Sequence, residues 1–211
     1  MRIIYLHGFA SSPQSSKAQY FGRKFAECGI PFECPQLDGG DFAHLTITGM
    51  LQTVDAAVGG DKVVMMGSSL GGYVAALFAA QHPERVECII ALAPAFRFLE
   101  RWQHRFTPQQ LDEWRRRGSL PVYHYGTKSE QPLSYQLIDD AAQYPPEPAF
   151  PQPTLILHGT ADEVVPSSGS EELAAQRSNI TLKLFSSGHE LTDVLDQLWQ
   201  QTARFLQIVH N

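Results

Sequence analysis

Ser69 has the sequence surroundings of a reactive serine. It is the central residue of Gly67-Ser68-Ser69-Leu70-Gly71, which follows an apolar run at 62–66 and precedes a small-residue helical segment at 72–81. A serine on a sharp strand-to-helix turn exposes its hydroxyl for attack on an acyl carbon, and that turn needs glycine two residues away on either side. Ser68 lacks glycines at these offsets. The pattern therefore predicts Ser69 as the nucleophile of a hydrolase-type reaction.

Asp162 and His189 are the residues that would activate this serine. A serine hydroxyl is too weak an acid to attack unaided, so it needs a histidine base, which in turn needs a carboxylate to fix its tautomer. Asp162 follows the apolar run 154–157, and His189 follows the next run, 181–185. Because parallel strands end on one side of a sheet, both loops should open at the same edge as Ser69.

Both assignments have alternatives in the same loops. Asp162 could instead be a turn aspartate that bonds its own backbone, and Glu163 would then be the substitute acid. His158 also stands at the end of an apolar run and is the alternative base, but it precedes the acid in the chain. A histidine in this position more often bonds loop backbone, so His189 remains the predicted base.

His7-Gly8-Phe9 follows the first apolar run and is the candidate for an oxyanion-binding loop. Attack on an ester creates a negatively charged oxygen, which must be met by two backbone donors already in place. The Leu70 N–H, next to the nucleophile, is one candidate and the Phe9 N–H is the other. His7 and Gly8 would support this loop, and the alternative is a plain turn at the end of a strand.

The elements that must position these residues alternate along the chain. The predicted strands are 2–6, 32–35, 62–66, 87–92, 154–157 and 181–185. The predicted helices are 15–28, 45–58, 72–81, 168–176 and 191–209. Strands separated by helices imply right-handed crossovers and a mainly parallel sheet of about six strands with helices on both faces, an α/β fold whose ligand crevice lies at the carboxyl ends of the strands.

Residues 97–150 interrupt this alternation. They contain Phe98, Trp102 and Phe106 at a helical spacing of four, and then Thr107, which can cap a second helix that ends at Gly118. A further helical piece is expected near 135–142. Because a connection of this length between two core strands is uncommon, we expect a mostly helical lid inserted into a single domain spanning 1–211.

Composition excludes several other classes of protein. The chain has 211 residues, a net charge of -6 and 43% hydrophobic residues, typical of a soluble globular protein and unlike a nucleic-acid-binding one. It has no uninterrupted apolar stretch of the roughly 18 residues that could cross a bilayer. With no signal-peptide core at its start, we expect a cytoplasmic protein.

The three cysteines of the chain have no metal-ligand spacing and are expected to be reduced, with a Cys28–Cys34 bridge as the alternative.

One basic segment runs against the acidic charge of the whole chain. Six arginines lie between Arg97 and Arg117, against the three acids Glu100, Asp112 and Glu113. They could attract an anionic group on a substrate, such as a carboxylate, a phosphate or a coenzyme A tail. The alternative is that Arg115 to Arg117 form a solvated helix end favoured by the helix dipole.

Together these residues resemble the α/β-hydrolase superfamily, in which the order Ser, Asp, His along the chain is usual. The opening Tyr5-Leu6-His7-Gly8-Phe9, followed by Ser11-Ser12-Pro13, Ser15 and Lys17, is similar to a group of small bacterial esterases within it. The resemblance covers the chain except for 97–150. It implies an ester-cleaving serine enzyme with no cofactor and no metal, whose triad is Ser69, Asp162 and His189 and whose oxyanion donors are Phe9 and Leu70.

The sequence thus predicts a carboxylic ester hydrolase that acts on a small-molecule ester through an acyl-enzyme. We expect this protein to have no nucleic-acid partner. Thioester cleavage or acyl transfer would use the same residues. A non-catalytic binding protein of the same fold is the alternative from another class, although such proteins usually lose a catalytic residue and none is missing here.

Overall fold

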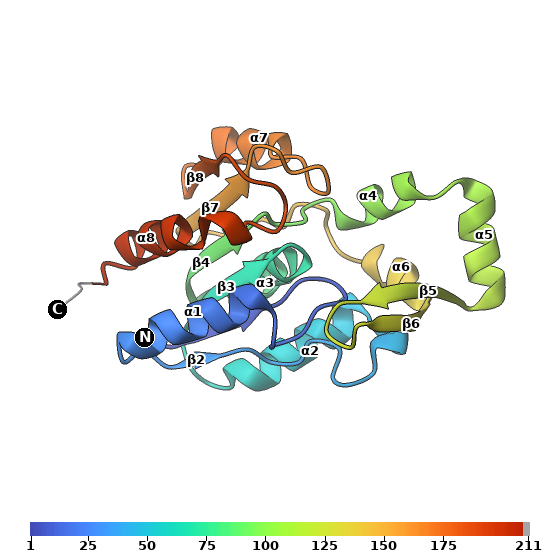
Figure 1. Ribbon diagram of the computed structural model, residues 1–211, viewed down its shortest axis with the longest axis horizontal. Helices are drawn as coiled ribbons and strands as arrows, with labels where there is room; N and C mark the ends of the chain where they lie inside the picture. The colour runs from blue at the N-terminus through green and yellow to red at the C-terminus, as the bar shows by residue number, and fades with distance from the viewer. Residues whose placement is uncertain (209–211) are drawn as a thin grey trace.

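A six-stranded parallel sheet forms the centre of the protein, whose structure, a computed structural model, describes residues 1–208 (Figure 1). Its strands are β1 (Ile3–Leu6), β2 (Phe32–Glu33), β3 (Val63–Ser68), β4 (Val86–Leu92), β7 (Thr154–Gly159) and β8 (Ile180–Phe185). They lie in the order β2-β1-β3-β4-β7-β8, and every pairing is parallel. The predicted sheet is confirmed, and β1 is the neighbour of β3, as the proposed oxyanion loop requires.

Helices cover both faces of the sheet, as predicted. They are α1 (Ser16–Glu27), α2 (Ile47–Val58), α3 (Leu70–Gln81), α7 (Ser168–Gln176) and α8 (Leu195–Phe205), with short 3-10 turns η1 (Phe42–His44), η2 (Pro83–Arg85) and η3 (Thr192–Val194). Ile3 and Tyr5 of β1 pack in a cluster with α1 and α8, whereas Ile4 and Leu6 pack in a second cluster with α2 and α3. Because both faces are buried, the strands read as continuous apolar runs rather than alternating ones.

Two element boundaries differ from the sequence prediction in ways that matter. Strand β3 continues to Ser68, beyond the predicted 62–66, and α3 starts at Leu70, so Ser69 alone makes the turn between them. The helix predicted at 191–209 is the turn η3 followed by α8. Residue 209 lies outside the described residues.

Residues 97–150 form a segment inserted between β4 and β7, called here the inserted segment. It contains α4 (Phe98–Arg105), α5 (Pro108–Arg117), the hairpin strands β5 (Ser119–His124) and β6 (Ser129–Ser134), and α6 (Gln136–Ala141). In Figure 1 it extends from one end of the sheet, with α5 outermost. Thr107 caps α5 as predicted, in a capping box with Gln110, and Gly118 ends the helix with φ of 78°, a left-handed conformation that glycine adopts readily.

The hairpin was not predicted and makes the inserted segment less helical than expected. Its two strands pair in antiparallel register with Pro121 opposite Pro132. Proline has no N–H for a strand ladder, so a run with a central proline gives a weak strand signal. The hairpin joins the hydrophobic core on the α2/α3 side of the sheet, in which Trp114 is buried and its Nε1 donates to the Leu133 carbonyl at 2.9 Å.

Two further sequence expectations concern membrane-spanning helices and the cysteines. Over residues 1–208, no helix combines the length and the apolar character needed to traverse a bilayer. Cys28, Cys34 and Cys88 are all free thiols, so the alternative Cys28–Cys34 bridge is not formed.

Candidate active site

Ser69 occupies a strained turn at the carboxyl end of β3. Its backbone angles are φ 53° and ψ -118°, in a region that a non-glycine residue rarely adopts. Hydrogen bonds on both sides hold it there: its N–H donates to the Leu92 carbonyl at 2.9 Å, and its own carbonyl accepts from the N–H of Ala95 at 3.0 Å. The side chain of Ser69 is thereby presented at the end of the sheet rather than into it.

The glycines on either side of Ser69 are required by close backbone approach. A Cβ placed on Gly71 would overlap the carbonyl oxygen of Leu6 in the neighbouring strand, and one placed on Gly67 would overlap the carbonyl oxygen of Gly71. Neither obstacle is a side chain that could rotate away. The sequence interpretation of the spacing therefore has a direct steric basis.

The structure brings the three predicted triad residues together. His189 Nε2 lies 3.0 Å from Ser69 Oγ, and His189 Nδ1 lies 2.7 Å from Asp162 Oδ2. His189 follows β8 and Asp162 follows β7, so residues far apart in sequence meet because parallel strands end at one edge. The imidazole bridges the hydroxyl and the carboxylate, the arrangement in which a histidine can move a proton from a serine.

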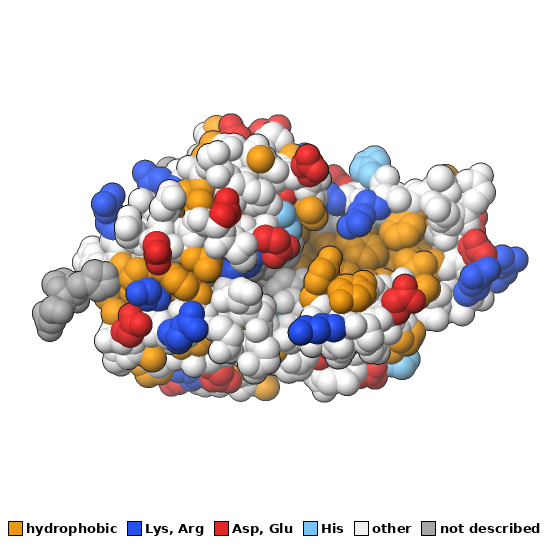
Figure 2. Space-filling model, in the orientation of Figure 1, with side chains coloured by type: hydrophobic (Ala, Val, Ile, Leu, Met, Phe, Trp, Pro, Cys, Tyr) orange, Lys and Arg blue, Asp and Glu red, His pale blue; other side chains and the backbone are white. Residues whose placement is uncertain are grey.

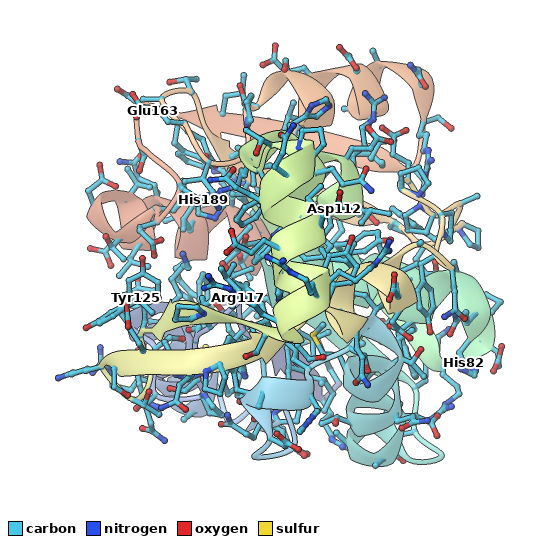
Figure 3. The ribbon with its side chains drawn as sticks, turned by 90° about the vertical axis from the view of Figure 1, so that its right-hand side faces the viewer. His82, Asp112, Arg117, Tyr125, Glu163 and His189 are labelled. Carbon is cyan, nitrogen blue, oxygen red and sulfur yellow. The ribbon has the colours of Figure 1, made fainter. Side chains whose placement is uncertain are left out.

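Asp162 is held as a carboxylate by its surroundings. Its side chain is buried, and its second oxygen, Oδ1, accepts from the backbone N–H groups of Val164 at 2.9 Å and Val165 at 2.7 Å. Burial on its own would raise the pKa of Asp162, but hydrogen bonds from His158, His189 and the Val165 backbone outweigh it and hold that pKa well below the ordinary value. Glu163, the alternative acid, is exposed and lies at the periphery, away from His189 (Figure 3).

His158 contacts the same carboxylate from the buried side. It has no exposed surface, and its Nε2 lies 3.2 Å from Asp162 Oδ2 and 2.8 Å from the Val165 carbonyl. Since a carbonyl only accepts, Nε2 carries the proton, and Nδ1 can then accept from the Ser170 hydroxyl at 2.8 Å. His158 thus contacts Asp162 but not Ser69, whose hydroxyl is met by His189 instead.

The proposed oxyanion loop follows β1 and is braced by His7. The Leu37 N–H donates to His7 Nε2 at 3.2 Å, so Nδ1 carries the proton and donates to the Gly8 carbonyl at 2.9 Å. Burial lowers the pKa of His7, which favours this neutral form over opposing effects from the Gly8 bond and Asp38. Phe9 and Leu70 both line the cleft described next, and neither N–H has an intramolecular acceptor within residues 1–208.

A cleft of about 700 Å³ opens over these groups. Ser69 and His189 lie on its floor, and Phe98, Trp102 and Tyr125 of the inserted segment form a wall. Figure 2 shows the hollow, with hydrophobic side chains along one side and basic side chains at the rim. A space of this size accommodates a small-molecule substrate.

Lys17 is a site residue whose role sequence reasoning missed. It lies in the first turn of α1, is buried, and its Nζ donates to the Glu190 carbonyl at 2.6 Å, with the Glu190 carboxylate 3.6 Å away. Burial lowers the pKa of Lys17, against the attraction of Glu190. The contact ties α1 to the loop that carries His189. Lys17 belongs to the opening motif that carries the family resemblance, but no local sequence pattern identifies Glu190 as its partner.

In the described part of the chain, no cluster of three or more His, Cys, Asp or Glu side chains is arranged to hold a metal ion.

Comparison with known families gives one match across nearly the whole chain. The model of the family described as Uncharacterised protein family (UPF0227) matches residues 2–207. Two curated relatives, the mitochondrial palmitoyl-protein thioesterase ABHD10 of Rattus norvegicus and of Mus musculus, are each 27% identical over 187 residues, covering 82% of this chain. The alignment covers 62% of those relatives, so the chain spans less than two thirds of their length.

Solved structures share the fold at lower identity. Alpha/beta hydrolase domain-containing protein 10 from mouse superposes with a TM-score of 0.80 at 21% identity, over 97% of this chain and 89% of that one. A putative hydrolase from Agrobacterium vitis S4 gives 0.82 at 21% identity, over 99% and 88%. Est1E from Butyrivibrio proteoclasticus, with ferulic acid bound, gives 0.80 at 20%, over 98% and 88%. These likenesses confirm the predicted α/β-hydrolase fold.

Proposed function

We propose, from the premise that this chain belongs to the UPF0227 family and has the α/β-hydrolase fold, that it is a serine hydrolase cleaving carboxylic esters through an acyl-enzyme. The observation that carries the proposal is the pair of contacts made by His189, 3.0 Å to the Ser69 hydroxyl and 2.7 Å to the Asp162 carboxylate. Ser69, held in a strained turn, and His189 line the cleft, and the Asp162 carboxylate is buried behind the imidazole.

The reaction follows from the positions of these atoms. Ser69 Oγ attacks the acyl carbon as its proton passes to His189 Nε2, and the same proton is then given to the leaving alcohol as the ester bond breaks. Water next attacks the acyl-serine, again losing a proton to His189, and the acid leaves with the Ser69 hydroxyl restored. Asp162 keeps Nδ1 protonated and stabilises the imidazolium formed in each step.

The negative charge that develops on the acyl oxygen is assigned to two backbone donors. Phe9 and Leu70 line the cleft, and their backbone N–H groups are free of intramolecular acceptors in the described residues, so these groups are available to an oxyanion. Leu70 is the first residue of α3, where the N–H groups of a helix have no partner within the helix. One such donor typically contributes about 3 kcal/mol to lowering the barrier.

The inserted segment is proposed to be the lid of this site within a single domain. It contributes Phe98, Trp102 and Tyr125 to the wall of the cleft. Apolar side chains above a reacting centre exclude water from the substrate and strengthen the electrostatic interactions within.

Steady-state hydrolysis of p-nitrophenyl butyrate tests the proposal. Ser69→Ala should lower kcat/KM by roughly 10³-fold or more, since the nucleophile is lost while binding is kept. Ser68→Ala is the matched control, because it removes a neighbouring, buried hydroxyl that has no contact with His189. Equal rates in the wild type and Ser69→Ala would refute the assignment.

Thioester cleavage is the second candidate, favoured by the 27% identity to relatives named as palmitoyl-protein thioesterases. The same serine, histidine and carboxylate would serve, because a thiolate leaving group depends less on proton donation from His189 than an alkoxide leaving group does. Comparing kcat/KM for phenyl butyrate and S-phenyl thiobutyrate separates the two reactions. Running the assay with an added alcohol, and measuring the ester formed, would test for acyl transfer in place of hydrolysis.

A further inference from the structure

The six arginines between Arg97 and Arg117 occupy different environments. Three form ion pairs outside the cleft: Arg97 with Glu147, Arg115 with Asp139, and Arg117 with Glu113. Arg101 and Arg105 instead line the cleft and have no carboxylate partner among residues 1–208. Arg116 neither lines the cleft nor forms an ion pair with any described residue. Half of the six arginines are thus paired with neighbouring carboxylates, and two of the three unpaired ones face the site.

Arg101 is fixed in place with its terminal nitrogens unused. It is half-buried on α4, and its Nε donates to the Phe96 carbonyl at 2.9 Å. Its Nη2 lies beside Gly169 in α7, close enough that a Cβ there would contact it. The guanidinium therefore reaches from α4 toward the first turn of α7. Neither Nη group has a hydrogen-bond acceptor in the described chain, which leaves the planar fork of donors open to the cleft.

Positive charge predominates among the side chains around the cleft. The charged side chains that line it are Lys17, Arg101, Arg105, Lys128 and Glu190. Glu190 is already paired with Lys17, and Arg101, Arg105 and Lys128 form no ion pair with any described residue, although Asp162 and Glu100 attract Arg101 at longer range. This excess of positive charge stands in a chain whose net charge is -6. Clefts lined by one sign of charge concentrate ligands of the other sign.

We infer that the substrate carries an oxyanion group, carboxylate or phosphate, held at the cleft rim by Arg101 with Arg105 and Lys128. The inference rests on the proposed function and narrows its substrate class. A guanidinium whose Nη groups are free matches such a group with two parallel hydrogen bonds, and two nearby cations add attraction. The apolar wall formed by Phe98 and Trp102 would take the uncharged part of the same molecule.

Matched ester pairs test the inference and show which end carries the charge. The acyl pair is mono-p-nitrophenyl glutarate against p-nitrophenyl pentanoate. The leaving-group pairs are p-acetoxybenzoate against its methyl ester, and p-acetoxyphenyl phosphate against p-methoxyphenyl acetate. In at least one pair the wild type should prefer the charged member, and Arg101→Gln should lower that preference about tenfold, mainly through KM.

Arg116→Gln is the matched control, since it removes an arginine of the same segment outside the cleft. It should keep the wild-type preference, and salt at about 0.5 M should weaken that preference in the wild type by screening. Hydrolysis of the neutral esters with no charge preference in any pair would overturn the inference and leave the proposed function standing.

A binding measurement keeps the inference testable if no ester is cleaved, which would contradict the proposed function. Trp102 lines the cleft, so tryptophan fluorescence of Ser69→Ala should report occupancy. Tighter binding of p-acetoxybenzoate than of its methyl ester, lost in Ser69→Ala combined with Arg101→Gln, would support the inference. Equal dissociation constants for the charged and neutral member of every pair would overturn it.

Discussion

The ring of Trp102 packs edge-on against the ring of Phe9, with the centroids 5.0 Å apart. Trp102 lies on α4 of the inserted segment, and Phe9 follows β1 and supplies one of the two proposed oxyanion donors. The Phe9 ring also contacts Phe42 at 5.6 Å. The inserted segment is thus in direct contact with the loop whose backbone must be held still during the reaction.

Trp102→Ala should therefore reduce turnover even of a substrate too small to need the cleft wall. Removing the indole frees Phe9 to move, and a displaced oxyanion donor should lower kcat for p-nitrophenyl acetate by about tenfold. Tyr123→Ala is the control, because Tyr123 is an exposed aromatic residue of the same segment that does not line the cleft. An unchanged kcat in Trp102→Ala would show that this packing does not support the oxyanion loop.

Gly71→Ala should disrupt the turn that carries Ser69. The added Cβ would overlap the Leu6 carbonyl oxygen, and the strand must shift to relieve it. Forcing atoms into a packed region costs about 1–3 kcal/mol, so the urea midpoint and the esterase rate should both fall. Gly60→Ala, where a Cβ meets open space, should leave both nearly unchanged. Equal stability of the two variants would contradict the steric account of the motif.

His158→Gln should reduce both stability and kcat. It removes the Nδ1 acceptor of the buried Ser170 hydroxyl and the rigid ring that holds Nε2–H against Asp162 and the Val165 carbonyl, and groups left unsatisfied in this way typically cost about 1–3 kcal/mol in unfolding free energy. An Asp162 carboxylate that is held less rigidly should lower kcat about tenfold with little change in KM. His82→Gln, on the far side of the molecule from His189 in Figure 3, is the control. A wild-type value of kcat in His158→Gln would contradict the role of His158 in positioning the Asp162 carboxylate.

Asp162 should make the fold sensitive to acid. The pKa of its carboxyl is held well below the ordinary value in the folded protein, because hydrogen bonds outweigh burial, whereas the unfolded chain should titrate near the usual value of about 3.9. The unfolded state therefore binds the proton first as pH falls, and the stabilisation present above pH of about 4 is lost below it. The free energy of unfolding, measured between about pH 5 and 3, should fall less steeply in Asp162→Asn. Parallel slopes would contradict this.

The sheet, the turn at Ser69 and the loops of Asp162 and His189 could be predicted from the sequence, because local sequence signals are sufficient there. Each predicted strand is an apolar run bounded by turn residues, and the parallel order of such strands places their following loops at one edge. The geometry agrees with the predicted grouping, while the catalytic roles of these residues stay predictions.

Other features depend on contacts that no local pattern reports. The hairpin escaped prediction because Pro121 and Pro132 interrupt its strands. Lys17 meets Glu190 from the opposite end of the chain. Arg97 and Arg101 are a helical turn apart, yet one pairs with Glu147 and the other faces the cleft, a difference that only the tertiary packing sets.

Covalent labelling with a fluorophosphonate tests the central claim most directly, because the reagent reacts with a serine that a nearby base has activated. The adduct should map by mass spectrometry to the peptide carrying Ser69, should be retained in Ser68→Ala, should slow strongly in His189→Ala, and should be absent from Ser69→Ala. A wild-type protein that stays unlabelled, or one labelled equally after Ser69→Ala, would contradict the account.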